Sequence, residues 1–128
     1  MSHMDKKELA VGLKHGGCNC CQAVLCAFAE ESGLSEEELK KIGAAFGVGM
    51  GCLEATCGAL IGAQILMGMK NYQGRPVLRD AAQIHNRFKL MCGSSICHEL
   101  KGRDTGVVLC ECDDCVRNAV ALVEEVYG

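Results

Sequence analysis

Residues 57–69 read CGALIGAQILMGM, a run of small and apolar residues that follows a glycine-rich stretch over residues 46–58. Gly58, Gly62 and Gly68 interrupt the run, and Gln64 lies within it. The run is therefore too short and too interrupted to cross a bilayer, which takes about 20 apolar residues. We predict a tightly packed core helix, preceded by a glycine-rich loop.

The sequence before this run predicts three further helices. Residues 5–14 form a short amphipathic helix, and Asn19 is placed to cap a helix of about residues 20–31. The second of these helices is apolar on all sides and belongs in the core. Ser35 and Glu38 form a capping box for a third helix.

The sequence after the run continues in the same way. Pro76 suits the first turn of a helix that Gly93 ends, and Ser94 or Ser95 caps a short helix before a last one of about residues 113–126. The apolar residues 107–109 suggest a short β-strand, although no second strand is predicted with which it could pair. We expect an all-α fold, a compact single-domain bundle of about five to six helices.

Length and composition fit one globular domain. Of the 128 residues, 49% are hydrophobic and 23% charged, with a single proline, and this balance excludes a disordered chain. The net charge of -3 and the 4% of aromatic residues argue against the basic surface and stacking platforms that nucleic-acid binding needs. We expect no nucleic-acid partner and no membrane span.

The first residues carry no visible targeting signal. MSHM at residues 1–4 resembles a cloning remnant, so His3 is left out of the site reasoning, and the cysteine-rich domain is expected over residues 5–128. Residues 1–11 are charged and lack the apolar segment and cleavage site of a secretion signal. The expected compartment is cytoplasmic.

Cysteine is the unusual feature of the composition, with eleven residues. Such a density is typical of disulfide scaffolds, yet an odd number cannot pair completely within one chain, and a reducing cytosol keeps thiols reduced. Reactive or metal-bound thiols are therefore the favoured interpretation. The eleven are Cys18, Cys20, Cys21, Cys26, Cys52, Cys57, Cys92, Cys97, Cys110, Cys112 and Cys115.

Four cysteines lie at or just before the predicted start of a different helix: Cys20, Cys57, Cys97 and Cys112. There the unpaired backbone N–H groups and the helix dipole stabilise a thiolate over a thiol, by up to about 2 kcal/mol. Thiolates react with disulfides and bind metals. Four thiolates from four elements also form a complete ligand set for zinc or an iron–sulfur cluster, provided that the helix starts converge.

At these residues the chain resembles the redox-active family named for a Cys-Gly-Ala-x-x-Gly motif and further spaced cysteines, the C-GCAxxG-C-C family. The resemblance rests on NCCQAVL at residues 19–25, CGALIG at 57–62, GSSICHEL at 93–100 and a final cysteine before VRNA at 116–119. It implies a small helical cytoplasmic protein with a redox role assigned from its cysteines.

Carried over to this chain, the resemblance places the family's cysteines on Cys20, Cys57, Cys97 and Cys112. Cys115 replaces Cys112 if the last helix is shifted. Cys20, Cys57, Cys97 and Cys112 are the candidate catalytic residues. The same four together with Cys115 are the candidate cofactor-binding and metal-binding set.

The other cysteines carry weaker signals. Cys26 and Cys92 lie inside apolar helices and are interpreted as core residues. Cys20 and Cys21 point about 100° apart on a helix, so they cannot both face one site. CECDDC at residues 110–115 combines spacings that suit a metal, a cluster edge or a dithiol, although its two aspartates oppose thiolate formation.

Three functional hypotheses follow. In the first, the helix-start cysteines gather at one site and transfer electrons or exchange thiols for disulfides with a redox partner protein or a small thiol. Their cofactor is then an iron–sulfur cluster, or otherwise zinc or none. In the second, the thiols bind or store zinc or copper(I) without turnover. In the third, the protein is a structural homodimer whose thiols are core residues. The sequence leaves open whether the protein is an enzyme.

Overall fold

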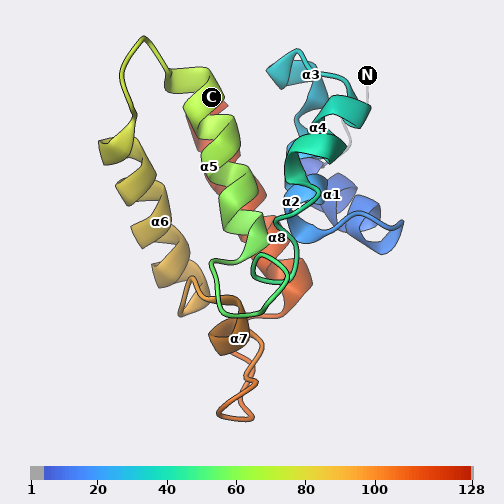
Figure 1. Cartoon of the computed structure of the whole chain (residues 1–128), viewed down its shortest axis with the longest axis vertical. Helices are drawn as coiled ribbons and strands as arrows, with labels where there is room; N and C mark the ends of the chain where they lie inside the picture. Colours follow the sequence, from blue (N-terminus) through green and yellow to red (C-terminus); the bar gives the residue numbers. More distant parts are fainter. Residues whose placement is uncertain (1–4, 128) are drawn as a thin grey trace.

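The computed structural model describes residues 5–127, so the expected remnant at residues 1–4 lies outside the described part. The described chain is all-α, which confirms the predicted fold class (Figure 1). Its eight helices exceed the five to six expected. They are α1 (Lys6–His15), α2 (Cys20–Ala27), α3 (Ala29–Ser32), α4 (Glu36–Gly43), α5 (Gly58–Asn71), α6 (Leu78–Cys92), α7 (Cys97–Leu100) and α8 (Cys112–Tyr127).

Local capping signals account for several helix boundaries. The Asn19 side chain accepts a hydrogen bond from the Gln22 N–H at 2.8 Å, and the Asn19 N–H donates to the Gln22 side chain at 2.9 Å. Ser35 forms the predicted capping box with Glu38. Gly93 ends α6 with φ of 95°, a backbone conformation that glycine adopts without steric cost. The predicted helix of residues 20–31 is instead divided into α2 and α3, because the backbone at residue 28 leaves the helical region.

Three local predictions are wrong. Pro76 lies two residues before α6, whose N-cap is Val77. Ile96 rather than a serine is the N-cap of α7, because Ser94 accepts from the Ile96 N–H at 3.1 Å and donates to Glu99. Residues 107–109 form no strand, and the described chain has only an isolated bridge between residues 56 and 96.

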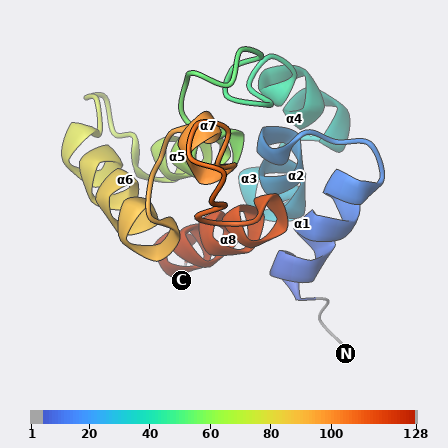
Figure 2. The same ribbon diagram turned by 90° about the horizontal axis from the view of Figure 1, so that it is seen from below.

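Helices α2, α5 and α8 pack against one another and form the centre of the bundle. α1 covers α2 and α8, α4 packs on α2, and α6 packs on α5 and α8 (Figure 1). Seen from below, α7 lies at the end of the molecule where α5 and α8 begin (Figure 2). Among the described residues, no helix combines the length and apolar character that crossing a membrane requires.

The glycines of the CGALIG segment bring α5 close to its neighbours. A Cβ atom at Gly58 would lie 2.4 Å from the Phe46 carbonyl oxygen, and one at Gly62 would lie 3.0 Å from the Cys21 carbonyl oxygen. These contacts are with backbone atoms, which cannot move aside as a flexible side chain does. The spacing of the two glycines therefore fixes how α5 sits against α2 and the loop before α5.

Candidate functional site

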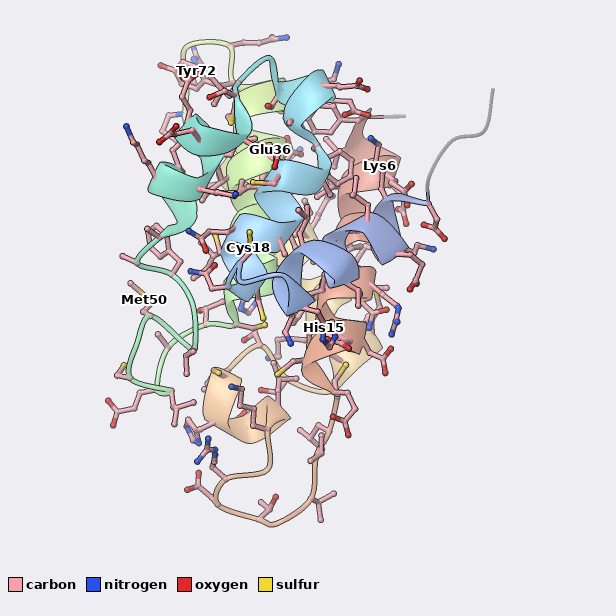
Figure 3. All side chains as sticks on the ribbon, turned by 90° about the vertical axis from the view of Figure 1, so that its right-hand side faces the viewer. Lys6, His15, Cys18, Glu36, Met50 and Tyr72 are labelled. Atoms are coloured by element: carbon pink, nitrogen blue, oxygen red, sulfur yellow. The ribbon has the colours of Figure 1, made fainter. Side chains whose placement is uncertain are left out.

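A cavity of about 260 Å³ lies where α2, α5, α7 and α8 begin. All five cysteines of the candidate set line it, together with two others. Figure 3 shows several sulfur atoms gathered at this end of the molecule, near the labelled Cys18 and His15. The lining cysteines are Cys18, Cys20, Cys57, Cys97, Cys110, Cys112 and Cys115.

Four of these thiols occupy the helix starts that the sequence predicts. Cys20, Cys97 and Cys112 are the first residues of α2, α7 and α8, and Cys57 is the N-cap of α5. We call these four the cavity cysteines. Their arrangement satisfies the condition of converging helix starts, which the sequence alone left open.

Backbone hydrogen bonds hold two of the cavity cysteines side by side. The Cys57 N–H donates to the Ser95 carbonyl at 2.7 Å, and the Cys97 N–H donates to the Ala55 carbonyl at 3.0 Å. A separate hydrogen bond attaches the start of α2 to the end of α4, because the Asn19 side-chain amide donates to the Gly43 carbonyl at 3.0 Å. The positions of these thiols are therefore set mainly by main-chain contacts.

Cys20 and Cys112 form a hydrogen-bonded pair across the cavity. The bond from Cys20 lowers the pKa of Cys112 to about 6, with help from the positive charges of Lys101 and Lys14 and against the effect of burial. The same bond and burial raise the pKa of Cys20. The two shifts run in opposite directions, toward a thiol at Cys20 and toward a thiolate at Cys112.

Cys57 and Cys115 form a second pair. The hydrogen bond from Cys115, joined by the backbone N–H groups of Ala59 and Leu60, lowers the pKa of Cys57 although burial opposes it. Its two N–H donors belong to the first turn of α5, so this is the helix-start effect that the sequence predicts. The remaining cavity cysteine, Cys97, differs, because burial raises its pKa.

The loop between α4 and α5 borders the cavity in a strained conformation. Val48, Met50 and Leu53 have φ of 54°, 60° and 67°, a region that costs non-glycine residues roughly 1–2 kcal/mol each. Val48 lines the cavity, and the Leu53 carbonyl accepts from the His98 N–H at 2.9 Å, which ties the loop to α7. Such strain persists only where surrounding contacts enforce it.

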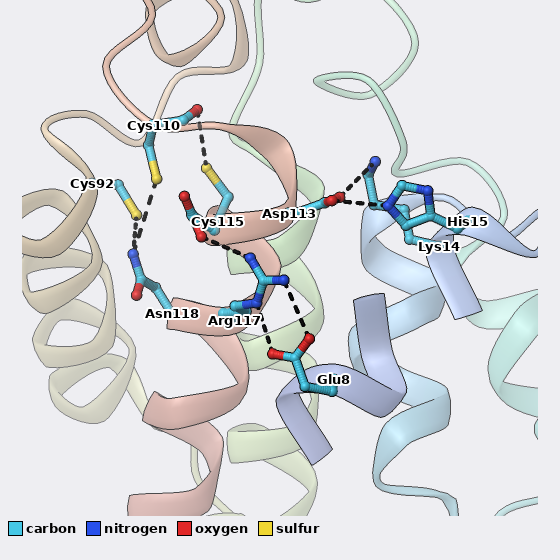
Figure 4. Close-up of polar contacts among 10 residues, drawn as sticks. Glu8, Lys14, His15, Cys92, Cys110, Asp113, Cys115, Arg117 and Asn118 are labelled. Carbon is cyan, nitrogen blue, oxygen red and sulfur yellow. Dashed lines mark hydrogen bonds and ion pairs between the residues drawn. The ribbon is translucent and has the colours of Figure 1, made fainter. Parts of the chain in front are cut away.

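A second group of three cysteines adjoins the cavity, and two of its members, Cys110 and Cys115, also line it. The Sγ atoms of Cys92, Cys110 and Cys115 all lie within 4.8 Å of one another, and we call these residues the cysteine trio (Figure 4). The Asn118 amide donates to Cys92 Sγ at 3.2 Å. The neighbouring Cys115 thiol first, and then the Asn118 amide and the Cys110 thiol, lower the pKa of Cys92 to about 6.

The position of Cys92 inside an apolar helix predicted a core residue only. Its side chain is indeed buried, at 3% exposed, yet its sulfur also completes the trio. The spacing of residues 110–115 indicated that Cys110 and Cys115 act together, but nothing local to Cys92 pointed to them. The link depends on the course of the chain from Gly93 to residue 110.

The remaining cysteines do not line the cavity. Cys21 is fully buried against the core, and burial raises its pKa to about 12. Cys26 is buried on the same helix, where burial raises its pKa to about 11, and its thiol donates to the Glu36 carbonyl. Cys52 is exposed. Cys20 and Cys21 thus point in different directions, as their helical spacing predicts.

One comparison with known proteins gives a match. The family model described as "Putative redox-active protein (C_GCAxxG_C_C)" matches residues 18–126, which include the cavity cysteines and the trio. No curated protein and no solved structure matches the chain.

Proposed function

Since the chain belongs to the C_GCAxxG_C_C family of redox-active proteins, we propose that it transfers electrons through an iron–sulfur cluster bound by Cys20, Cys57, Cys97 and Cys112. The observation that carries the proposal is the meeting of four helix-start thiols, from four separate elements, around one cavity. Iron–sulfur clusters are held by cysteine thiolates in sets of four. When bound, a cluster supplies reversible one-electron chemistry.

The donor set and its surroundings fit such a group. The pKa values of Cys57 and Cys112 are both lowered, toward the thiolate form that a metal needs. Metal binding deprotonates a coordinating thiol outright, so Cys20 and Cys97 would follow on loading. Lys14 and Lys101 line the cavity with positive charge that offsets the negative thiolates.

The apolar part of the lining supports the same chemistry. Val48 and Leu100 contribute apolar surface to the lining, and Gly58, which has no side chain, leaves room beside Cys57. Burial and limited solvent access are among the features by which a protein tunes the potential of a cluster.

A second candidate function is thiol–disulfide exchange, which the two hydrogen-bonded thiol pairs favour. The Cys112 thiolate would attack a substrate disulfide, form a mixed disulfide and release one substrate thiolate, which takes up a proton. Cys20 would then lose its proton and attack the Cys112 sulfur, releasing the second substrate thiolate. The protein ends with a Cys20–Cys112 disulfide, and the substrate gains two electrons.

Purification without oxygen, followed by assay of iron and acid-labile sulfide and a visible spectrum, tests these proposals. We expect iron, sulfide and broad visible absorbance in the unsubstituted protein, and their loss in Cys97→Ser. Cys26→Ser is the matched control, because both side chains are 5% exposed and Cys26 lies outside the cavity.

Other results would redirect the proposal. If the purified protein contains no metal and its thiols are lost reversibly in pairs, the result would support thiol–disulfide exchange instead of cluster binding. Several zinc or copper ions per chain, with no redox change, would instead support the storage function. Equal iron content in Cys97→Ser and Cys26→Ser would contradict the proposed ligand set.

A further inference from the structure

We propose that the cysteine trio is a second metal site, with a ligand set distinct from the four cavity cysteines, which binds one Cu(I) ion through Cys92, Cys110 and Cys115. The three sulfurs come from three places in the chain: the last residue of α6, the loop before α8 and the first turn of α8. Two of the residues, Cys92 and Cys110, lie outside the cysteine positions implied by the family pattern. The site goes beyond the proposed electron transfer and does not require it.

The spacing of the trio suits coordination of a single ion. With metal–sulfur bonds of about 2.3 Å, sulfurs bound to one ion lie about 4 Å apart. The three Sγ atoms already lie within 4.8 Å of one another, so closure needs only small side-chain movements. Cys92 and Cys115 are buried and Cys110 is half-buried, which limits the freedom of the ligands before binding.

The number and type of ligands favour Cu(I). Thiolates are soft ligands that select Cu(I), zinc or iron–sulfur clusters, and zinc in structural sites takes four ligands almost without exception. Among the described residues, no fourth histidine, cysteine or carboxylate joins the trio within the same mutual distance. Three thiolates without a fourth partner therefore suit the lower coordination number of Cu(I).

Asn118 has the place of a supporting residue rather than a ligand. Its amide nitrogen, which donates hydrogen bonds and cannot bind a metal, lies 3.2 Å from Cys92 Sγ and 4.0 Å from Cys110 Sγ (Figure 4). Hydrogen bonds of this kind orient ligands and stabilise their charge, and their loss commonly weakens metal binding about 10–100-fold.

A surface groove gives the ion a route to the trio. Cys110 and Asn118 line a groove of about 640 Å³ together with Met91, whose side chain is 42% exposed. The Met91 thioether is itself a soft ligand, so it adds a sulfur to the lining of this groove. Lys7 and Arg117 line the same groove and reduce the local negative charge, which Glu111 and Asp114 increase.

Titration of Cu(I) into the full-length, fully reduced protein tests the proposal, with a chromophoric Cu(I) chelator as competitor. The cavity is first disabled by Cys20→Ser, Cys97→Ser and Cys112→Ser together. We expect this triple variant to retain one tightly bound Cu(I) per chain, with three sulfurs around copper in X-ray absorption.

Adding Cys110→Ser to the triple variant should lower the Cu(I) affinity more than 100-fold, beyond the loss of about 10–100-fold expected for Asn118→Ala. Cys18→Ser is the matched control, because Cys18 and Cys110 are both half-buried. Cys110 lies in a loop, so its substitution tests the site without altering a helix, and far-UV circular dichroism checks the fold.

Three results would overturn the proposal: no stoichiometric Cu(I) in the triple variant, equal Cu(I) affinity after Cys110→Ser and Cys18→Ser, or tight zinc binding in preference to Cu(I). Iron content of Cys110→Ser in the otherwise unsubstituted chain separates this test from that of the cluster. Retained iron supports two separate sites, whereas loss of iron would assign Cys110 to the cavity ligands and contradict the separation.

Discussion

The cavity cysteines and the cysteine trio are neighbours, yet they are held in place by different means. The cavity sulfurs belong to helix starts, where the Cys115 thiol and then main-chain N–H groups lower the pKa of Cys57, and main-chain bonds fix Cys57 beside Cys97. The trio is assembled from a helix end, a loop and a first turn, and its hydrogen-bond donor is the Asn118 side chain. Backbone changes should therefore damage the cavity first, and side-chain changes the trio.

The largest expected effect comes from Gly58→Ala, which adds a methyl group 2.4 Å from the Phe46 carbonyl oxygen. Because a backbone oxygen must move, we expect destabilisation of about 1–3 kcal/mol and loss of bound iron. Urea unfolding and iron analysis measure both. Gly12→Ala is the control, since nothing lies within 4 Å of its added Cβ, and it should stabilise α1 by about 0.5–1 kcal/mol. Unchanged stability and iron content in Gly58→Ala would contradict this account of the motif.

A pair of adjacent substitutions separates cavity function from core packing. Cys21→Ser places a hydroxyl in a fully buried position and should cost about 1–3 kcal/mol of stability while iron binding persists. Cys20→Ser should lose the bound iron and should lower the free energy of unfolding by less than Cys21→Ser does. Urea denaturation and iron content, measured on both variants, report the two effects. Equal losses of iron and of stability in the two variants would contradict the assignment of Cys20 to the cavity and of Cys21 to the core.

A smaller effect concerns the pH dependence of thiol alkylation in reduced, metal-free protein. With a pKa of about 6, Cys112 is mostly thiolate at pH 7, so its rate should rise through pH 6 and level off above it. The pKa of Cys110 is raised to about 11, chiefly by burial, so its rate should still be rising at pH 10. Mass spectrometry of peptides after brief labelling distinguishes the two residues. Lys101→Ala should shift the Cys112 profile to higher pH, because the lysine charge lowers that pKa.

The smallest effect is expected at the ion pairs that join α1 to α8 on the surface. Arg117 donates to Glu8 at 2.9 Å and to Asp114 at 2.8 Å, and both carboxylates are well exposed (Figure 4). Exposed pairs contribute little and are screened by salt. Glu8→Gln should therefore lower the urea midpoint slightly at low salt and leave iron and copper contents unchanged. A large fall in either metal would mean that the docking of α1 controls both sites.

The difference between local and tertiary contacts also explains which parts of the fold and of the site the sequence predicts. The all-α class and the caps at Asn19 and Ser35 follow from local patterns, because a cap and its partner lie three residues apart. The helix-start positions of the cavity cysteines were predictable for the same reason. Their meeting at one cavity was not, since it depends on how α2, α5, α7 and α8 pack.

Local sequence patterns could not predict the cysteine trio or the correct helix boundaries near residues 28 and 94, because both depend on tertiary contacts. Cys92 and Cys115 are separated by the whole course of α7 and its loops, and no local pattern fixes that path. Ser94 was a reasonable cap from composition, but its hydroxyl is engaged by Glu99 and by the Ile96 N–H. The break between α2 and α3 at Phe28 likewise has no proline or glycine that would have predicted it from the sequence.

The convergence of helix N-termini has a consequence for the driving force of electron transfer. α2, α5 and α8 all begin at the cavity, so the positive ends of their dipoles would face any group held there. A positive field stabilises the state that has gained an electron. Any redox centre held by these thiolates should therefore have a higher reduction potential than the same centre, with the same ligands, in a site without helix starts. The bundle architecture would thus set the direction in which electrons flow as well as the place where they are held.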